Sequence, residues 1–351
     1  MAATRLSDLI VPEVFASYMQ NKTEELTALV SGGILTRDLS LDAKLAGGGL
    51  TFEAPSFTDL DNTAANIGSD DPGVTSTPLA IGSLQETAVR LNRNQSWSNM
   101  NLNNILTNED PMAAIADLVA AYWAREAQRT LLATSVGIFA DNDAAPSVAE
   151  HVQYDLTHDA KGAGFVAGTT DFNAGNFISA VGTMGDAADG LGIVFMHSIV
   201  YQTAQRNNLI DFVSDAVNPN AAKVPMYLNR RVVVDDSMPN PAASGVTSTA
   251  TGIYHTYIVG PGAFTWGVGN PPRPVTTTYD EDTGNGQGQE TLYSRVQWCI
   301  HPTGHAYQGT AANGGPSNLA TTNNLAHAAS FGRVYPERKQ IKIARLITRE
   351  A

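Results

Sequence analysis

Two histidines with a ligand-like spacing are the first candidates for chemistry in this sequence. His301 and His305 stand four residues apart in HPTGH, and on a helix that spacing would place both imidazoles on one face, where they could hold a metal ion. Pro302 and Gly304 lie within the segment and disfavour such a helix. We therefore expect a turn with two half-buried histidines rather than a metal site.

A second candidate is the acidic segment DEDTGNGQGQE. Its residues Asp280, Asp282 and Asn285 resemble part of a calcium-binding loop. The fifth position of that loop is Gly284, and Asn285 stands where the loop needs its invariant glycine. The segment therefore does not predict a calcium site.

A pair of carboxylates, Asp235 and Asp236, follows a predicted strand. Strand ends host active sites in many α/β enzymes, so the pair could do acid–base work in a two-lobed α/β hydrolase. No histidine or lysine lies nearby in the sequence to complete such a site. We favour a solvated strand end and keep the hydrolase as an alternative.

The familiar enzyme signatures are missing. The sequence has no G-x-S-x-G, no GK[ST], no H-E-x-x-H and no C-x-x-C. The GPG at 260–262 predicts a turn, because no helical pattern follows it. We predict no catalytic residue, no cofactor and no metal.

Charge narrows the partners. The chain has 34 acidic and 21 basic residues, a net charge of −13, so tight sequence-specific DNA binding is not expected. Six bases and one acid lie between Arg333 and Arg349. That cluster could touch phosphate, but we favour a solvated face or ion pairs between subunits.

The single cysteine and the apolar pattern bear on the compartment. Cys299 has no partner for an internal disulfide, which fits a reducing environment. The start, MAATRLSDLIVPEVF, carries Asp8, Pro12 and Glu13 where a signal peptide would need an apolar core. No apolar run reaches about 18 residues. We expect a soluble protein made inside the cell, with no membrane partner.

The longest predicted element is a helix over 110–137. Asp110 is a suitable N-cap, Pro111 suits the first turn, and Gly137 is the expected stop. The helix would span roughly 40 Å, enough to support two sheets or domains. Glu126 falls in the apolar arc, so we expect it to pair with Arg129, one turn on, or with an arginine of a neighbouring subunit, and we favour the pair within the chain.

Before this helix, the pattern predicts an arm and a flap. An amphipathic helix over 14–30, followed by Gly32 and Gly33, cannot bury its apolar stripe alone, and the glycines at 47–49 provide a hinge. Alternation at 50–54 and 87–91 then predicts a strand pair. Its polar connection, 59–78, predicts a long projecting hairpin.

After the helix, a Gly-, Asp- and Thr-rich boundary at 141–172 leads to an α/β region. Helices are predicted at 173–189 and 198–207, the second capped by Ser198. Strands of this region are predicted at 192–196, 227–235 and 253–259, and it ends in a Gly/Pro-rich segment at 260–274. Two further strands are predicted at 290–300 and 339–347.

This order of parts, with two local sequences, resembles the major capsid proteins of tailed bacteriophages. RRVVVDDSMP at 230–239 is similar to a strand and turn of their axial domain, and ETLYSRVQWCIHPTGHAY at 290–307 is similar to a strand of their peripheral domain. The resemblance implies an α+β, Hong Kong 97 type (HK97-like) fold. Its parts would be an N-terminal arm (1–47), the E-loop hairpin and flanks (48–107), a peripheral domain with a long spine helix (108–172), an α/β axial domain (173–276) and return strands of the peripheral domain (277–351).

The resemblance also implies a function and partners. Such a subunit self-assembles as hexamers and pentamers into the icosahedral head shell of a virion, and assembly takes place in the host cytoplasm. The shell encloses double-stranded DNA, which it contacts non-specifically. The other implied partners are a portal, a scaffold and a cement protein. Some relatives cross-link their shells through a flap lysine, but no lysine lies between Lys44 and Lys161. The short leading segment favours a separate scaffold protein or none. An encapsulin-like nanocompartment shell is the nearest alternative.

Overall fold

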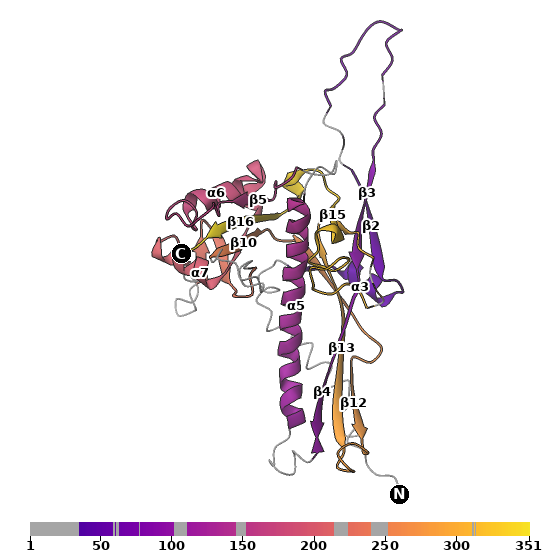
Figure 1. Cartoon of the computed structure of the whole chain (residues 1–351). Coiled ribbons are helices and arrows are strands. Elements are labelled where there is room, and N and C mark those ends of the chain that lie inside the picture. The colour runs from indigo at the N-terminus through magenta and orange to yellow at the C-terminus, as the bar shows by residue number, and fades with distance from the viewer. Residues whose placement is uncertain are drawn as a thin grey trace.

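The structure is a computed structural model, and a long upright helix divides it into two halves (Figure 1). It describes residues 35–58, 60, 63–76, 78–101, 111–144, 152–213, 224–239, 252–310, 312 and 314–351. A seven-stranded sheet lies on one side of the helix, a five-stranded sheet lies on the other, and a hairpin projects beyond both. The expected arm helix over 14–30 lies outside the described residues.

The long helix, α5, runs over Pro111–Asp143, which is roughly 50 Å. The expected stop at Gly137 is wrong, because this glycine lies inside the helix. A Cβ there would stand 2.0 Å from the backbone oxygen of Leu325, so the glycine permits a close approach of two chain segments instead of ending the helix. The expected N-cap, Asp110, lies outside the described residues.

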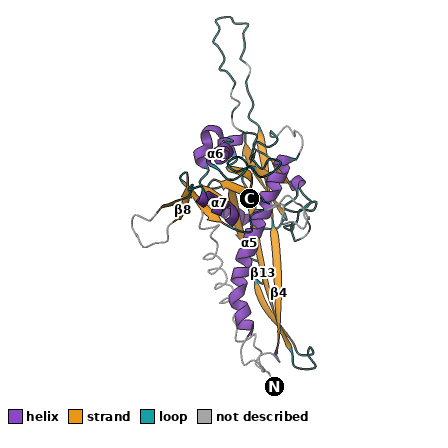
Figure 2. Cartoon of the chain, turned by 60° about the vertical axis from the view of Figure 1, so that its left-hand side comes forward, coloured by secondary structure: helices purple, strands orange, loops and turns teal. Residues whose placement is uncertain are grey.

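The five-stranded sheet is organised around one long strand, β13 (Gln289–Pro302). Strand β4 (Leu91–Met100) pairs with one edge of β13, while β12 (Val275–Asp280) and β11 (Phe264–Gly269) pair with successive parts of the other edge. The short β1 (Leu35–Arg37) extends the sheet beside β11. β4 and β13 run alongside α5 in both views (Figure 2).

The seven-stranded sheet has the order β5-β16-β10-β6-β9-β8-β7 and is covered on both faces. Its strands are β5 (Thr157–Asp159), β6 (Ile193–Met196), β7 (Asp211–Val213), β8 (Val224–Tyr227), β9 (Arg230–Val234), β10 (Ile253–Val259) and β16 (Ile343–Arg349). Alternate residues of one strand enter different cores: Val194 packs with helices α6 (Ala174–Gly182) and α7 (Ser198–Arg206), whereas Phe195 packs on the side of α5.

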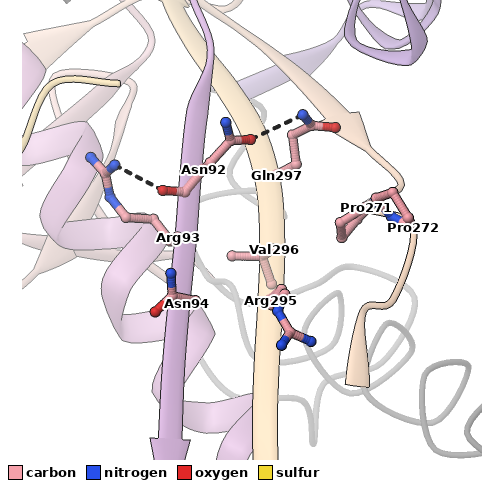
Figure 3. Close-up of a pocket in the computed structure, with 8 residues that line it drawn as sticks. All are labelled: Asn92, Arg93, Asn94, Pro271, Pro272, Arg295, Val296 and Gln297. Carbon is pink, nitrogen blue, oxygen red and sulfur yellow. Dashed lines mark hydrogen bonds between the residues drawn. The ribbon is translucent and has the colours of Figure 1, made fainter. Parts of the chain in front are cut away.

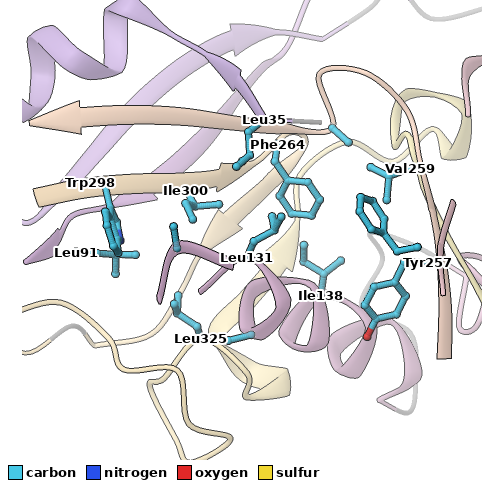
Figure 4. Packing of buried hydrophobic residues seen from close by; sticks show 14 of the residues in the cluster. Leu35, Leu91, Leu131, Ile138, Tyr257, Val259, Phe264, Trp298, Ile300 and Leu325 are labelled. Carbon is cyan, nitrogen blue, oxygen red and sulfur yellow. The ribbon is translucent and has the colours of Figure 1, made fainter. Parts of the chain in front are cut away.

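A continuous apolar core joins α5 to both sheets (Figure 4). Leu131 and Ile138 of the helix lie between Trp298 and Phe264 of the five-stranded sheet and Tyr257 of the seven-stranded sheet. All five side chains are at most 4% exposed. The helix therefore supports two sheets, as its predicted length suggested.

The remaining elements are small. β2 (Thr51–Phe57) pairs with β3 (Ser83–Val89), and β14 (His305–Tyr307) pairs with β15 (Phe331–Arg333). Helix α3 (Leu39–Ala46) packs beside β11. Short 3₁₀ helices are η2 (Gly185–Gly190), η4 (Ala328–Ser330) and η5 (Arg338–Gln340). Among the described residues, no helix is long and apolar enough to cross a bilayer.

Sheet pairing corrects several sequence-based expectations. The Gly/Pro-rich segment 260–274 is not only an exit, because it contains β11. The polar run 91–100 is a strand, since β13 supplies its hydrogen-bonding partner. The last strand, β16, pairs with β10 and β5, so residues 277–351 contribute strands to both sheets. Helix α7 is capped by the His197 ring, not by Ser198.

Candidate functional site

The projecting flap extends beyond both sheets (Figure 1). β2 and β3 form a regular antiparallel ladder, and the described residues between 58 and 82 continue beyond it as an extended loop (Figure 1). Two hydrogen bonds close the base of this loop: the Thr58 amide donates to the Gly82 carbonyl at 3.0 Å, and the Gly82 amide donates to the Thr58 hydroxyl at 2.9 Å. The confirmed hairpin is thus an ordered strand pair that carries a long open tip.

Apolar side chains on the flap face solvent. Ile67 is 94% exposed, and the other large exposed apolar residues of the flap are Phe57, Leu60, Val74, Leu79 and Ile81. A two-stranded ribbon is marginal by itself in water, and exposed apolar side chains gain free energy when they are covered. The flap therefore suits a contact with something outside its own chain.

The tip of the flap is a defined turn. The Asp71 side chain accepts a hydrogen bond from the Gly73 amide at 2.8 Å, and the Val74 amide donates to the Asp71 carbonyl at 3.1 Å. The Asp71 amide in turn donates to the Ser69 hydroxyl at 3.1 Å. These local bonds fix Asp71 at the end of the projection, and Asp70 directly precedes it.

The root of the flap is held by a small apolar cluster and an arginine. Phe52 of β2 packs with Leu45 of α3 and with the buried Cys299 of β13. The Arg90 guanidinium lies 5.1 Å from the centre of the Phe52 ring and donates to the Leu45 and Gly47 carbonyls at 3.0 and 2.6 Å. Burial raises the pKa of the Cys299 thiol to about 12, so this cysteine is a packing residue.

A buried hydrogen-bonded pair fixes the other side of the root. Glu86 of β3 lies 2.8 Å from Nε2 of His301, with side chains 11% and 9% exposed. The Gly304 amide also donates to Glu86, at 3.3 Å. Burial alone would raise the pKa of Glu86, but hydrogen bonds from His301 and Tyr335 outweigh it and hold that pKa below its usual value.

The histidine pair is thus structural. His301 and His305 flank a turn with Gly304 at φ 80°, as the predicted turn requires, but both are buried rather than half-buried. Burial lowers the pKa of His305 to about 4, so this ring is neutral near pH 7. Among the described residues, no three metal-ligating side chains come together. Sequence reasoning missed Glu86, because the only sign of its burial is that it alternates with Ala88 and so shares its face of β3.

The acidic candidates also have structural roles. Asp235 accepts hydrogen bonds from Gln128 of α5 and from the Ser237 amide, and so ties the end of β9 to the helix. Asp236 is exposed; the Ser198 amide donates to it at 3.2 Å, and Nδ1 of His197 lies 3.9 Å away. Hydrogen bonds from Ser198 lower the pKa of Asp236, which is unsuited to a general base near neutral pH.

The calcium-like segment is the turn between β12 and β13. Asp280 accepts hydrogen bonds from the Asp282 amide at 3.1 Å and from the Thr283 hydroxyl at 2.9 Å. Gly284 and Asn285 both have positive φ, at 75° and 57°. The acidic side chains therefore shape a hairpin turn.

Basic residues near the C-terminus join α5 to the seven-stranded sheet. Arg345 of β16 is buried, donates to both Asp143 oxygens at 2.5 and 2.6 Å, and lies 4.7 Å from the Phe139 ring centre. Arg333 pairs with Asp155 at 2.5 Å and is 1% exposed. The expected solvated face or inter-subunit pairing is wrong for these two, because acids of the same chain, Asp143 and Asp155, pair with them.

The expected helix pair is confirmed. Arg129 lies 3.5 Å from Glu126, whose side chain is 15% exposed. The Asn318 amide donates to the other oxygen of Glu126 at 2.8 Å. The carboxylate in the apolar arc is thus partnered within its own chain.

Comparisons with known proteins agree with this architecture. No model of a known protein family matches the chain. The chain is 34% identical over 344 residues to the "Major capsid protein" of Bacillus phage SPP1, a match that covers 97% of this chain and 96% of that protein. Among solved structures, the chain resembles the cyanophage Pam1 capsid asymmetric unit, with a TM-score of 0.54, 11% identity, and coverage of 91% of this chain and 89% of that chain. It also resembles the capsid of Ralstonia phage GP4, with a TM-score of 0.51, 9% identity, and coverage of 91% of this chain and 87% of that chain. The two structural matches show the fold alone.

Proposed function

The chain belongs to the family of major capsid proteins of tailed phages, and from this membership we propose which segments join neighbouring copies in the shell. As a member, it is a structural protein of the virion that forms the shell of the phage head. The head-shell function is therefore preferred to the nanocompartment, and the hydrolase built on Asp235 and Asp236 is wrong.

We divide the chain into family parts by its sheets. The β2–β3 hairpin with loop 58–82 is the E-loop, and α5 is the spine helix. The five-stranded sheet belongs with α5 to the peripheral domain, and the seven-stranded sheet with α6 and α7 is the axial domain. This moves β11 into the peripheral domain and β16 into the axial domain, relative to the boundaries at 276 and 277 expected from sequence.

The projecting flap carries the proposal. Its loop extends away from the body, and Ile67 near its tip is 94% exposed. A copy of the same chain lying under this loop would cover that surface, and repetition around closed hexamers and pentamers would multiply a weak contact. Each subunit gains little from the flap alone and much in the closed lattice.

Other partners follow from charge and from the missing lysine. A net charge of −13 suits a wall that surrounds double-stranded DNA without gripping its phosphates. Because the flap has no lysine, its contacts are noncovalent, and a cement protein is a suitable reinforcement. A portal and a separate scaffold complete the proposed set of partners.

Deletion of residues 65–75 tests the role of the flap. The tip contributes no buried apolar side chain, so the unassembled subunit should keep its free energy of unfolding within about 1 kcal/mol. Shells, counted by electron microscopy and titrated with denaturant, should dissociate at lower denaturant than native shells. A variant with 65–75 replaced by glycine and serine of equal length separates loss of side chains from loss of reach. Native shell stability in both variants would contradict the proposal.

A further inference from the structure

Charge is distributed unevenly between the flap and the outer side of the five-stranded sheet. Between Lys44 and Arg90 the chain has six acidic residues and no basic one. Over 91–100, 264–279 and 291–302, which include β4, β11 and most of β13 and β12, it has three arginines and no acidic residue. Asp280 and Glu290 lie where β12 and β13 meet their connecting turn, and away from that end these strands carry no acidic residue, in contrast to the acidic flap.

A hollow lies on this sheet, between β13 and the loop that joins β11 to β12 (Figure 3). It has a volume of about 310 Å³. Its lining is apolar on one side and amide-rich on the other: Pro271, Pro272, Val296, Asn92, Asn94, Gln297, Arg93 and Arg295. Gln297 donates to Asn92 at 3.0 Å across the two strands.

The positive charge at the hollow comes from Arg295, beside Arg273. Nη1 of Arg295 donates to the Arg273 carbonyl and to the Thr276 hydroxyl, both at 3.1 Å, so the guanidinium is held in place without an acidic partner among the described residues. Arg273 is exposed and follows the two prolines. Arg93 points to the opposite side of the sheet, where it donates to the Gly314 carbonyl at 3.2 Å.

We propose that this hollow receives the flap tip of a second copy, with Asp70 and Asp71 facing Arg273 and Arg295. The inference rests on the proposed role of the flap and names the surface that binds the flap tip. This surface, the hollow with Arg273 and Arg295, is called the seat below. Pro72 and Val74 of the tip would lie against Pro271 and Pro272, so apolar and charged surfaces match together.

The flap tip that fills the hollow must come from another copy, because of the shape of the molecule. From Thr58 to Asp70 an extended chain reaches roughly 40 Å. The loop carries the tip away from the body on the side opposite the far end of β12 and β13 (Figure 1). A chain therefore cannot fill its own hollow, whereas a neighbour in a ring can fill the next one around a closed cycle.

Packaged DNA is the competing occupant, since phosphates also attract arginine. Pro271 and Pro272 favour a peptide with apolar side chains over a phosphate backbone. Empty shells, assembled without DNA, distinguish the two occupants.

A charge exchange tests the contact. Asp70→Arg with Asp71→Asn changes the tip from −2 to +1 and keeps the turn, because asparagine retains the oxygen that bonds Gly73. Arg273→Glu with Arg295→Gln changes the seat from +2 to −1. Each pair of changes should raise the subunit concentration needed for half-maximal assembly of empty shells by about tenfold, which is about 1.4 kcal/mol. The two together should return it to within about threefold of native.

Controls separate this seat from the flap's general role. Glu53→Gln removes one charge at the flap base and should leave assembly within about twofold of native. If both charge variants assemble like native while the 65–75 deletion weakens shells, the tip acts elsewhere and the seat is wrong. Failure of the combined variant to recover, or an effect confined to DNA-filled particles, would also overturn it.

A crosslink gives a second measurement that does not depend on charge. Ser69→Cys combined with Pro272→Cys should form disulfides between copies in assembled shells, seen as ladders on a non-reducing gel, and none in unassembled subunits. The native Cys299 is 0% exposed and does not compete. Native-like shells that show no ladder under oxidation would contradict the proposed seat.

Discussion

The flap and the joint between α5 and β16 use polar residues in opposite ways. At the joint, Arg345 is buried against Asp143 and Thr157, so each charge meets an opposite charge within the chain. At the flap tip, Asp70 and Asp71 meet no cation among the described residues, and apolar neighbours face solvent. The joint therefore stabilises the subunit itself, whereas the flap leaves charged and apolar surface exposed for contacts with other subunits in the shell.

Breaking the joint should give the largest effect on the subunit. Arg345→Ala leaves Asp143 and Thr157 without their partner and opens a space beside Phe139, so the free energy of unfolding should fall by about 3 kcal/mol or more. Chemical denaturation of unassembled subunits measures it. The control is Arg129→Ala, at an arginine whose side chain is 62% exposed, which should cost less than about 1 kcal/mol. Equal costs would remove the distinction between the joint and exposed pairs.

The second-largest effect should come from a fall in pH, which should destabilise the root of the flap. The pKa of His305 is about 4 in the folded chain and 6.5 in the unfolded chain, so the unfolded chain binds the proton first as pH falls. Stability is therefore complete above pH 6.5 and falls between pH 6.5 and 4, by about 3 kcal/mol for this ring. The lowered pKa of Glu86 acts in the same direction at lower pH, below its unfolded value of 4.5.

Unfolding of His305→Gln, followed from pH 7 to pH 4, measures this contribution. The variant should lose about 3 kcal/mol of the native pH dependence. His327→Gln, at a half-buried histidine outside this cluster, is the matched control. A native pH dependence in His305→Gln would mean that the ring is charged, or reachable by water, in the folded protein.

Local patterns predicted the elements better than the contacts between them. The flap strands, α6 and β10 follow from alternation and capping, because those signals lie within a few residues. Gly137 was misassigned as a stop because its purpose, close approach to Leu325, depends on a segment far along the chain. β11 was missed for a related reason: its glycines leave room for neighbours such as Leu41, which stands 2.7 Å from a Cβ built at Gly267.

The candidate site shows the same limit. The flap was predictable, since a polar loop between two alternating strands has few other solutions. The partners of Glu86 and Arg345 were not, because each pair joins residues more than 200 positions apart. Arg273 and Arg295 likewise meet only when β13 folds beside the loop after β11. Spacing within one sequence carries no signal for such pairs.

The smallest effect on the subunit should come from the flap itself. Ile67 is 94% exposed, so Ile67→Ser removes almost no buried surface, and the free energy of unfolding should change by less than about 0.5 kcal/mol. Shells should nevertheless dissociate at lower denaturant, because each copy would lose part of an apolar contact that recurs around the lattice. Subunit denaturation and shell dissociation, measured on the same preparation, give the two numbers. A subunit that loses more than about 1 kcal/mol while shells keep native stability would mean that the flap folds against its own chain, and the contrast with the joint would no longer hold.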